Sequence, residues 1–241
     1  MQTAGYALAM RTAAILPVKH FAQAKQRLGA SVSDPLRLEL ARAMVGDVLA
    51  ALGETTLIER TIVVTTEPSV VEVAHAQGAI VIDDTARDGQ SAAVSLGIER
   101  ALTEGMERAL CVPGDCPTLD PNELVALLSS QASGEAEVVI VPDRHGTGTN
   151  GLLLAPPGAI PPSFGLGSCE RHRELAIAAE IPWRIERPAS LLLDIDTGED
   201  LAALRARLSV ERLGASRTRA VLDRTAAKEQ PIITTSTSTP A

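Results

Sequence analysis

The sequence predicts an α/β fold of three layers, with helices on both faces of a mainly parallel sheet. Short apolar runs of strand length alternate along the chain with segments whose apolar residues recur at helical spacing. Proline and glycine punctuate these segments, for example Pro17 near the end of the first run and Gly53 after the first long helix. Strands that alternate with helices form right-handed βαβ units, and such units build a parallel sheet between two helix layers.

The expected elements follow in this rhythm from the first apolar run at 13–18. Ser33 and Asp34 precede Pro35, which opens a helix whose apolar residues then recur every three or four positions up to Leu52. The expected strands cover residues 13–18, 62–65, 79–82, 109–112, 138–141, 151–155 and 191–195. The expected helices cover residues 36–52, 69–76, 91–102, 122–129, 168–179 and 198–208.

The end of the chain has a different character. Beyond about Glu211 the apolar periodicity is lost, and the last residues read TTSTSTP. We therefore expect residues 1–210 to form a single domain and residues 211–241 to be a disordered C-terminal tail.

The composition limits the class of partner. The 241 residues are 45% hydrophobic and only 2% aromatic, and their formal net charge is -8. A protein that binds nucleic acid or an anionic membrane over a wide surface needs a basic field to attract phosphates. The sequence therefore predicts no nucleic acid and no membrane as partners, and favours a small-molecule substrate.

Cysteine usage and hydropathy bear on the compartment. Cys111, Cys116 and Cys169 have no metal-finger spacing and cannot form a disulfide framework in a chain of this length. The chain shows no apolar stretch of secretory or membrane-spanning length. We expect reduced thiols and a cytoplasmic protein.

Cations crowd the loop after the first strand. Lys19, Lys25 and Arg27 lie in the segment PVKHFAQAKQRL, and active sites in parallel sheets lie beyond the carboxyl ends of the strands. Such cations can neutralise a triphosphate and the charge that develops on leaving pyrophosphate. The alternative is a solvated basic face of a helix.

Three aspartates are candidate ligands for Mg²⁺, which prefers oxygen donors. Asp115 follows the strand 109–112 in the segment VPGDCPTLD, and Asp194 and Asp196 lie in LLLDIDTGEDL. If the last two alternate along a strand, a bend is needed for both to face one ion. The alternatives are an ordinary turn at Asp115 and a helix N-terminus at the Asp196–Thr197 pair.

Two glycine-containing segments could hold an anion. In PDRHGTGTN the glycines allow backbone amides to approach a phosphate, and Thr149 adds a hydroxyl donor. In FGLGSCERH, Ser168 opens a helix whose free N–H groups attract anions, with Gly165 just before it. Alternatives are a plain glycine-rich hairpin and simple capping by Ser168. Arg171 and His172 could face the anion or solvent.

Together these clusters suit metal-assisted phosphoryl transfer. The motifs PVK, AKQRL, GDCP, PDRHGTGTN, FGLGS followed by RH, and DIDTGEDL occur in this order. This pattern resembles the guanylyltransferase family of deazaflavin coenzyme F-420 biosynthesis, over roughly residues 13–208. The DRxGTGTN loop with FGxxS and RH is its most specific part, whereas GDxP is shared with many nucleotidyltransferases of the glycosyltransferase-A-like fold.

The resemblance implies a fold, a reaction and a set of residues. It implies the nucleotidyltransferase fold and transfer of GMP from GTP to phosphoenolpyruvate, 2-phospholactate or 3-phosphoglycerate, with release of pyrophosphate. The acceptor would thus be a small phosphorylated three-carbon acid, and a homodimer is a plausible assembly. The residues implied are Lys19, Lys25 and Arg27 for the GTP phosphates, Asp115, Asp194 and Asp196 for Mg²⁺, and Thr149, Gly165 and Ser168 for the acceptor. Among these, Lys25, Arg27 and Asp115 are the expected catalytic residues.

One segment departs from the family pattern. Residues 88–91, DGQS, resemble the nucleobase loop of related cytidylyl- and molybdopterin-type transferases. Gln90 and Ser91 are therefore the candidates for reading the base, and a CTP-using or molybdopterin-type transferase is an alternative. A non-catalytic nucleotide-binding regulator is a second alternative, which the acids and cations argue against.

Overall fold

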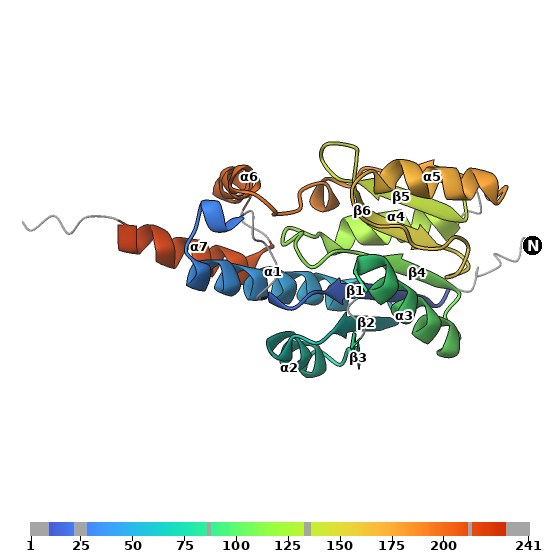
Figure 1. Cartoon of the computed structure of the whole chain (residues 1–241), viewed down its shortest axis with the longest axis horizontal. Helices are drawn as coiled ribbons and strands as arrows, with labels where there is room; N and C mark the ends of the chain where they lie inside the picture. Colours follow the sequence, from blue (N-terminus) through green and yellow to red (C-terminus); the bar gives the residue numbers. More distant parts are fainter. Residues whose placement is uncertain (1–9, 22–27, 86–87, 133–135, 212–213, 230–241) are drawn as a thin grey trace, which may run out of the picture.

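Seven strands form one sheet in the described part of the chain. The computed structural model describes residues 10–21, 28–85, 88–132, 136–211 and 214–229. The strand order is β3-β2-β1-β4-β6-β5-β7, and β6 alone runs antiparallel to its neighbours (Figure 1). The predicted α/β class with a mainly parallel sheet is confirmed. The strands are β1 (Thr12–Val18), β2 (Arg60–Thr65), β3 (Ile80–Ile82), β4 (Arg108–Cys111), β5 (Val138–Pro142), β6 (Thr149–Leu154) and β7 (Trp183–Ile185).

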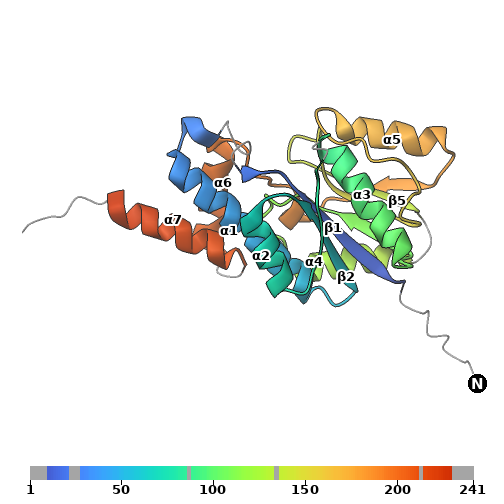
Figure 2. The ribbon, with the colours of Figure 1, turned by 60° about the horizontal axis from the view of Figure 1, so that its bottom comes forward.

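Helices cover both faces of this sheet, as predicted (Figure 2). Side chains alternate along β1, so Ala14 and Leu16 pack with α1, α2 and α4, whereas Ile15 packs with α3 and α5. Helix α3 approaches β1 so closely that a Cβ at Gly97 would lie 2.4 Å from Ile15 Cγ2. The helices of these layers are α1 (Asp34–Glu54), α2 (Pro68–Ala76), α3 (Gln90–Thr103), α4 (Pro121–Ala132) and α5 (Ser168–Ala178).

The order of the strands creates a crevice beside β1. The chain passes from β1 outward to β2 and β3, then returns to β4 on the other side of β1. The loops after β1 and β4 therefore diverge, and ligands of open α/β sheets bind at such a switch point.

Two further helices pack against α1 at the left of Figure 1. Helices α6 (Gly198–Val210) and α7 (Ser216–Glu229) bury leucines and valines against Leu40, Ala43 and Met44 of α1. The predicted disorder of the tail is wrong for residues 216–229. The burial of Thr218, Val221 and Leu222 at helical spacing gives α7 a narrow apolar stripe, which an otherwise polar sequence conceals.

The strand predicted at 191–195 is also wrong. Its residues follow a short 3-10 turn, Ala189–Leu191, and their backbone groups bond to loops and side chains instead of a neighbouring strand. Ile195 N–H donates to the carbonyl of Asp115, and the Leu191 carbonyl accepts from the Asn150 side chain. The edge strand that does close this side of the sheet, β7, has only three residues and was not predicted.

The attachment of α7 gives a first prediction. The buried Asp47 carboxylate on α1 accepts hydrogen bonds from the backbone N–H of Arg217 (3.0 Å) and of Thr218 (2.8 Å). Asp47→Ala should weaken the docking of α7 by about 1–2 kcal/mol, because these N–H groups lose their acceptor. Trypsin should then cleave at the arginines of α7 about tenfold faster. The control is Asp223→Ala, at an exposed position on α7 itself. Equal rates of cleavage in the two variants would contradict the prediction.

Candidate active site

A cavity of about 480 Å³ opens at the crevice beside β1, a size that suits a small ligand. Lys19 lines it from the loop after β1, and Asp115 from the loop after β4. Gln90 contributes from the start of α3, and Asp196 from the segment before α6. Four residues predicted from separate parts of the sequence therefore meet at one cavity. Lys25 and Arg27 lie outside the described residues.

The loop after β1 is anchored just beyond Lys19. The Phe21 N–H donates to Glu67 Oε2 (2.9 Å), and the Phe21 carbonyl accepts from Arg37 (3.1 Å). Burial alone would raise the pKa of Glu67, but hydrogen bonds from Phe21 and Ser69 hold it below its usual value. The carboxylate therefore stays ionised and fixes the point from which the cationic segment departs.

The three predicted metal ligands converge. One carboxylate oxygen from each of Asp115, Asp194 and Asp196 lies within 4.8 Å of the others. Residues 194–196 are not a strand, which provides the bend that both aspartates need. Burial, together with the negative charges of Asp115 and Asp196, raises the pKa of Asp194. Such a group of oxygen donors with concentrated negative charge fits a hard divalent cation.

Asn150 orients one of these carboxylates. Its amide Nδ2 donates to Asp194 Oδ1 (3.1 Å) and to the Leu191 carbonyl (2.8 Å). Asn150 is buried at the start of β6, next to Thr149. Successive side chains of a strand point to opposite faces. Asn150 therefore points toward the aspartates, and Thr149 points toward α5.

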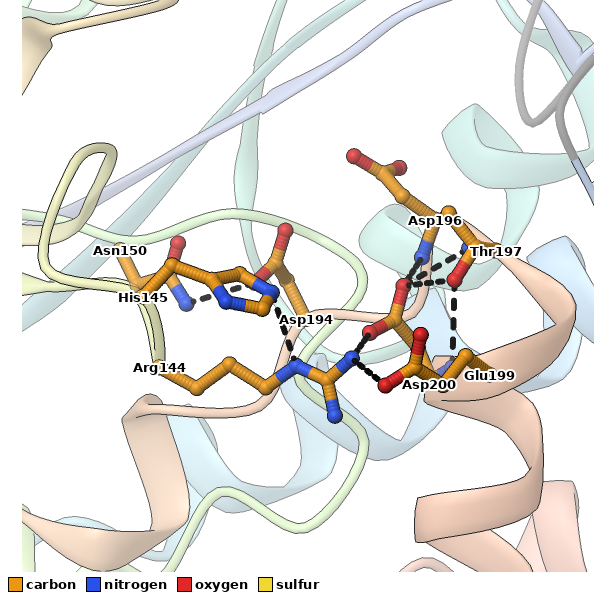
Figure 3. A network of polar contacts seen from close by, with 8 residues as sticks. All are labelled: Arg144, His145, Asn150, Asp194, Asp196, Thr197, Glu199 and Asp200. Carbon is orange, nitrogen blue, oxygen red and sulfur yellow. Dashed lines mark hydrogen bonds and ion pairs between the residues drawn. The ribbon is translucent and has the colours of Figure 1, made fainter.

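An ion pair connects the same loop to the segment of Asp196 (Figure 3). Arg144 donates to Asp200 Oδ1 (2.7 Å), and Asp200 Oδ2 accepts from the N–H of Asp196 (3.2 Å) and of Thr197 (2.8 Å). Asp200 and Thr197 form the capping box of α6. The Asp196–Thr197 pair therefore does lie at a helix N-terminus, which was the alternative raised from the sequence. Partial burial would raise the pKa of Asp200, but its hydrogen bonds with Thr197 lower it.

On the other face of β6, Thr149 contacts His172. The distance from Thr149 Oγ1 to His172 Nδ1 is 3.0 Å, and Ser163 N–H donates to His172 Nε2 (2.9 Å). Burial and the charge of Arg171 lower the pKa of His172 to about 4. His172 thus faces neither the cavity nor solvent, and is neutral near pH 7.

The loop before α5 is clamped by its neighbours. Arg171 donates to the carbonyls of Ser163, Phe164 and Leu166. The hydroxyl oxygen of Ser91 accepts from Phe164 N–H (2.8 Å), so this candidate base reader bonds to the loop and does not line the cavity. Ser91 at the start of α3 and Arg171 of α5 thus hold this loop from two sides.

Gly165 and Ser168 lie in the same region. Gly165 has φ of +109°, which only glycine adopts readily, and its carbonyl accepts from Ser168 N–H (3.0 Å). Ser168 is the first residue of α5 and makes no capping bond, which contradicts the capping alternative. Its buried hydroxyl has no hydrogen-bond partner among the residues that the structure describes. A ligand oxygen is a natural acceptor for it.

Several functional contacts were not predicted from the sequence. Asn150 and Arg144 belong to the conspicuous PDRHGTGTN segment, but nothing in a linear sequence indicates that they reach residues 194–200. The burial of His172 was also missed. The composition of the PDRHGTGTN segment indicated that it belongs to the site. The residues that its side chains contact depend on the tertiary structure and could not be predicted.

The cavity at the strand ends brings a lysine and converging acids together, which suits the binding of a phosphorylated ligand with a metal ion. Solved structures share this fold: a nucleotide-diphospho-sugar transferase from Desulfovibrio desulfuricans G20 has a TM-score of 0.70 and 17% identity, covering 90% of this chain and 95% of that one. CMP:2-keto-3-deoxy-manno-octonic acid synthetase, solved with CTP, has a TM-score of 0.58 and 13% identity, covering 83% and 98%. The chain therefore has the fold of nucleotidyltransferases.

Its family is narrower. Residues 12–207 match the family described as guanylyl transferase CofC like, and the chain belongs to that family. A phosphoenolpyruvate guanylyltransferase of Conexibacter woesei is 47% identical over 214 residues, covering 89% of this chain and 96% of that protein. One of Rubrobacter xylanophilus is 41% identical, covering 84% and 97%. The resemblance stated from the motifs is confirmed.

Among the described helices, none is both long and apolar enough to cross a lipid bilayer.

The burial of His172 predicts how stability depends on pH. Its pKa falls from 6.5 in the unfolded chain to about 4 in the fold. Below pH 6.5 the unfolded chain therefore binds a proton that the folded chain excludes, and stability decreases as the pH falls toward 4. At pH 5 this costs about 2 kcal/mol.

Urea unfolding of wild type and His172→Gln at pH 7 and pH 5 measures this contribution. The variant should lose less stability between these values than wild type does, since its side chain does not titrate. His75→Gln, at an exposed position on α2, is the matched control and should keep the wild-type dependence. An unchanged dependence in His172→Gln would show that the prediction is wrong.

Proposed function

We propose that this protein transfers GMP from GTP to phosphoenolpyruvate and releases pyrophosphate. The observation that carries the proposal is the convergence of Asp115, Asp194 and Asp196 at a cavity that Lys19 and Gln90 also line. Relatives named phosphoenolpyruvate guanylyltransferase, up to 47% identical, support the choice of both substrates. The resemblance to enzymes of coenzyme F-420 biosynthesis supports a place for the reaction in that pathway.

The nucleotide occupies the cavity in this proposal. Lys19, with Lys25 and Arg27 from the adjoining segment, neutralises the phosphates, and Gln90 faces the base. Ser91 acts through its backbone or through the loop that it holds. The residues that line the cavity hold the nucleotide in one orientation, and such positioning together with charge neutralisation supplies most of the catalysis in phosphoryl transfer.

The acceptor lies on the side of Thr149, Gly165 and Ser168. The phosphate of the acid is already a nucleophile, so no general base and no covalent intermediate are required. Its oxygen attacks the α-phosphorus of GTP, the bond to the β-phosphate oxygen breaks, and pyrophosphate leaves. The buried Ser168 hydroxyl is a suitable donor to the acid.

Mg²⁺ is the cofactor in this proposal, and Asp115, Asp194 and Asp196 would hold it. When bound, the ion neutralises phosphate charge and orients the reacting groups. The protein supplies the arrangement of the acids: Asn150 fixes Asp194, and Asp200 fixes the backbone of Asp196.

A direct assay tests the reaction. Purified protein with Mg²⁺ and GTP is incubated with phosphoenolpyruvate, 2-phospholactate or 3-phosphoglycerate, and pyrophosphate release is followed. We expect release with GTP and phosphoenolpyruvate, and little with CTP or ATP. Turnover with CTP alone would favour the cytidylyl alternative raised by the DGQS segment, and the absence of release with every pair would favour a binding protein without activity.

A second test addresses the metal. Asp196 is exposed, so Asp196→Asn should fold normally while removing one charge from the cluster. We expect weaker Mn²⁺ binding by calorimetry without substrates, and a turnover at least about 100-fold lower. Glu199→Gln, which changes a neighbouring exposed acid, is the control. Unchanged Mn²⁺ affinity in Asp196→Asn would remove this residue from the site.

A further inference from the structure

His172 joins the two segments that approach the acceptor side of the site. It is fully buried on α5, between Thr149 of β6 and Ser163 of the loop before α5. The ring of Phe164 packs against it edge-on, with 5.1 Å between ring centroids. These contacts on three sides leave the imidazole a single orientation.

The hydrogen bonds of the ring determine where its proton lies. A backbone N–H can only donate, so Nε2, which lies 2.9 Å from Ser163 N, must present a lone pair. In a neutral imidazole the other nitrogen then carries the hydrogen. Nδ1–H therefore donates to Thr149 Oγ1 across 3.0 Å.

This donation sets the direction of the threonine hydroxyl. Thr149 Oγ1 accepts from the ring, so its own hydrogen must point elsewhere, toward a different acceptor. With the opposite tautomer the hydroxyl would donate to the ring and turn a lone pair outward, which would repel an anion. The tautomer thus decides whether Thr149 attracts or repels a negatively charged ligand.

We infer that His172 is a positioning residue that fixes the Thr149 hydroxyl as a hydrogen-bond donor to the anionic acceptor. The inference rests on the proposed function, in which Thr149 contacts the phosphorylated acid. His172 itself touches no substrate and transfers no proton. Its effect therefore belongs to acceptor binding and not to GTP binding, which separates it from a general structural effect.

Two amide substitutions of His172 test the roles of its two ring nitrogens separately. The amide of His172→Asn reaches the position of Nδ1 and can still donate to Thr149. The longer His172→Gln places its amide near Nε2, where it can accept from Ser163 but cannot donate to Thr149. We expect Thr149→Val, which removes the hydroxyl donor to a charged group, to raise the KM for phosphoenolpyruvate about tenfold. We expect the same of His172→Gln, because the Thr149 hydroxyl is then no longer held as a donor. His172→Asn should stay within about threefold of wild type.

The double variant tests whether the histidine acts through the threonine. Thr149→Val with His172→Gln should have the same phosphoenolpyruvate KM as Thr149→Val alone, while the KM for GTP changes by less than about twofold in all variants. The inference is overturned if His172→Gln raises the phosphoenolpyruvate KM equally in both backgrounds, or if the GTP KM rises in parallel. His75→Gln controls for the substitution itself.

The tautomer is a readout that does not require turnover. In ¹⁵N NMR of the full chain, the ring signals lost in His172→Gln should belong to a protonated Nδ1 and an unprotonated Nε2. Protonation at Nε2 in an active enzyme would overturn this inference alone. If wild type turns over none of the acids, the proposed function fails, and the statement about the acceptor fails with it.

Discussion

Three carboxylates held within 4.8 Å of one another form the constraint on which the site depends. Like charges at this distance repel, and burial makes the repulsion of Asp194 stronger. The fold opposes this with a backbone hydrogen bond from Ile195 to the Asp115 carbonyl, with the amide of Asn150, and with the Asp200 carboxylate behind Asp196. The acids are therefore preorganised for a cation before one arrives, which lowers the reorganisation cost of binding it.

The PDRHGTGTN loop connects the two halves of the site. Arg144 reaches Asp200, Asn150 reaches Asp194, and Thr149 reaches His172 on the opposite face. Asp143 stabilises the loop itself: partial burial would raise its pKa, but hydrogen bonds from the N–H groups of Thr147 and Gly148 keep it below its usual value. This one short segment thus contacts both the aspartates and α5, which explains why its composition is so distinctive.

The sequence predicted the layers, six of the seven strands in the described ranges and the meeting of Asp115 with Asp194 and Asp196. The layers and strands follow from periodicity, whereas the set of three aspartates was implied by the family resemblance. It did not predict that residues 191–195 bond to loops, because an apolar run reads as a strand whatever lies beside it. Nor did it predict α7, whose polar surface exceeds its narrow buried stripe, or the histidine buried behind Thr149.

The position of α1 has a consequence for how this enzyme can change over time. Met44 of α1 lines the cavity, and it also belongs to the hydrophobic cluster that α1 forms with α6 and α7. The match to the family ends at residue 207, before α7 begins at Ser216. One wall of the cavity is therefore supported by α7, a helix beyond the residues that the family model matches. Substitutions in α6 or α7 can therefore shift that wall without changing any residue that lines the cavity.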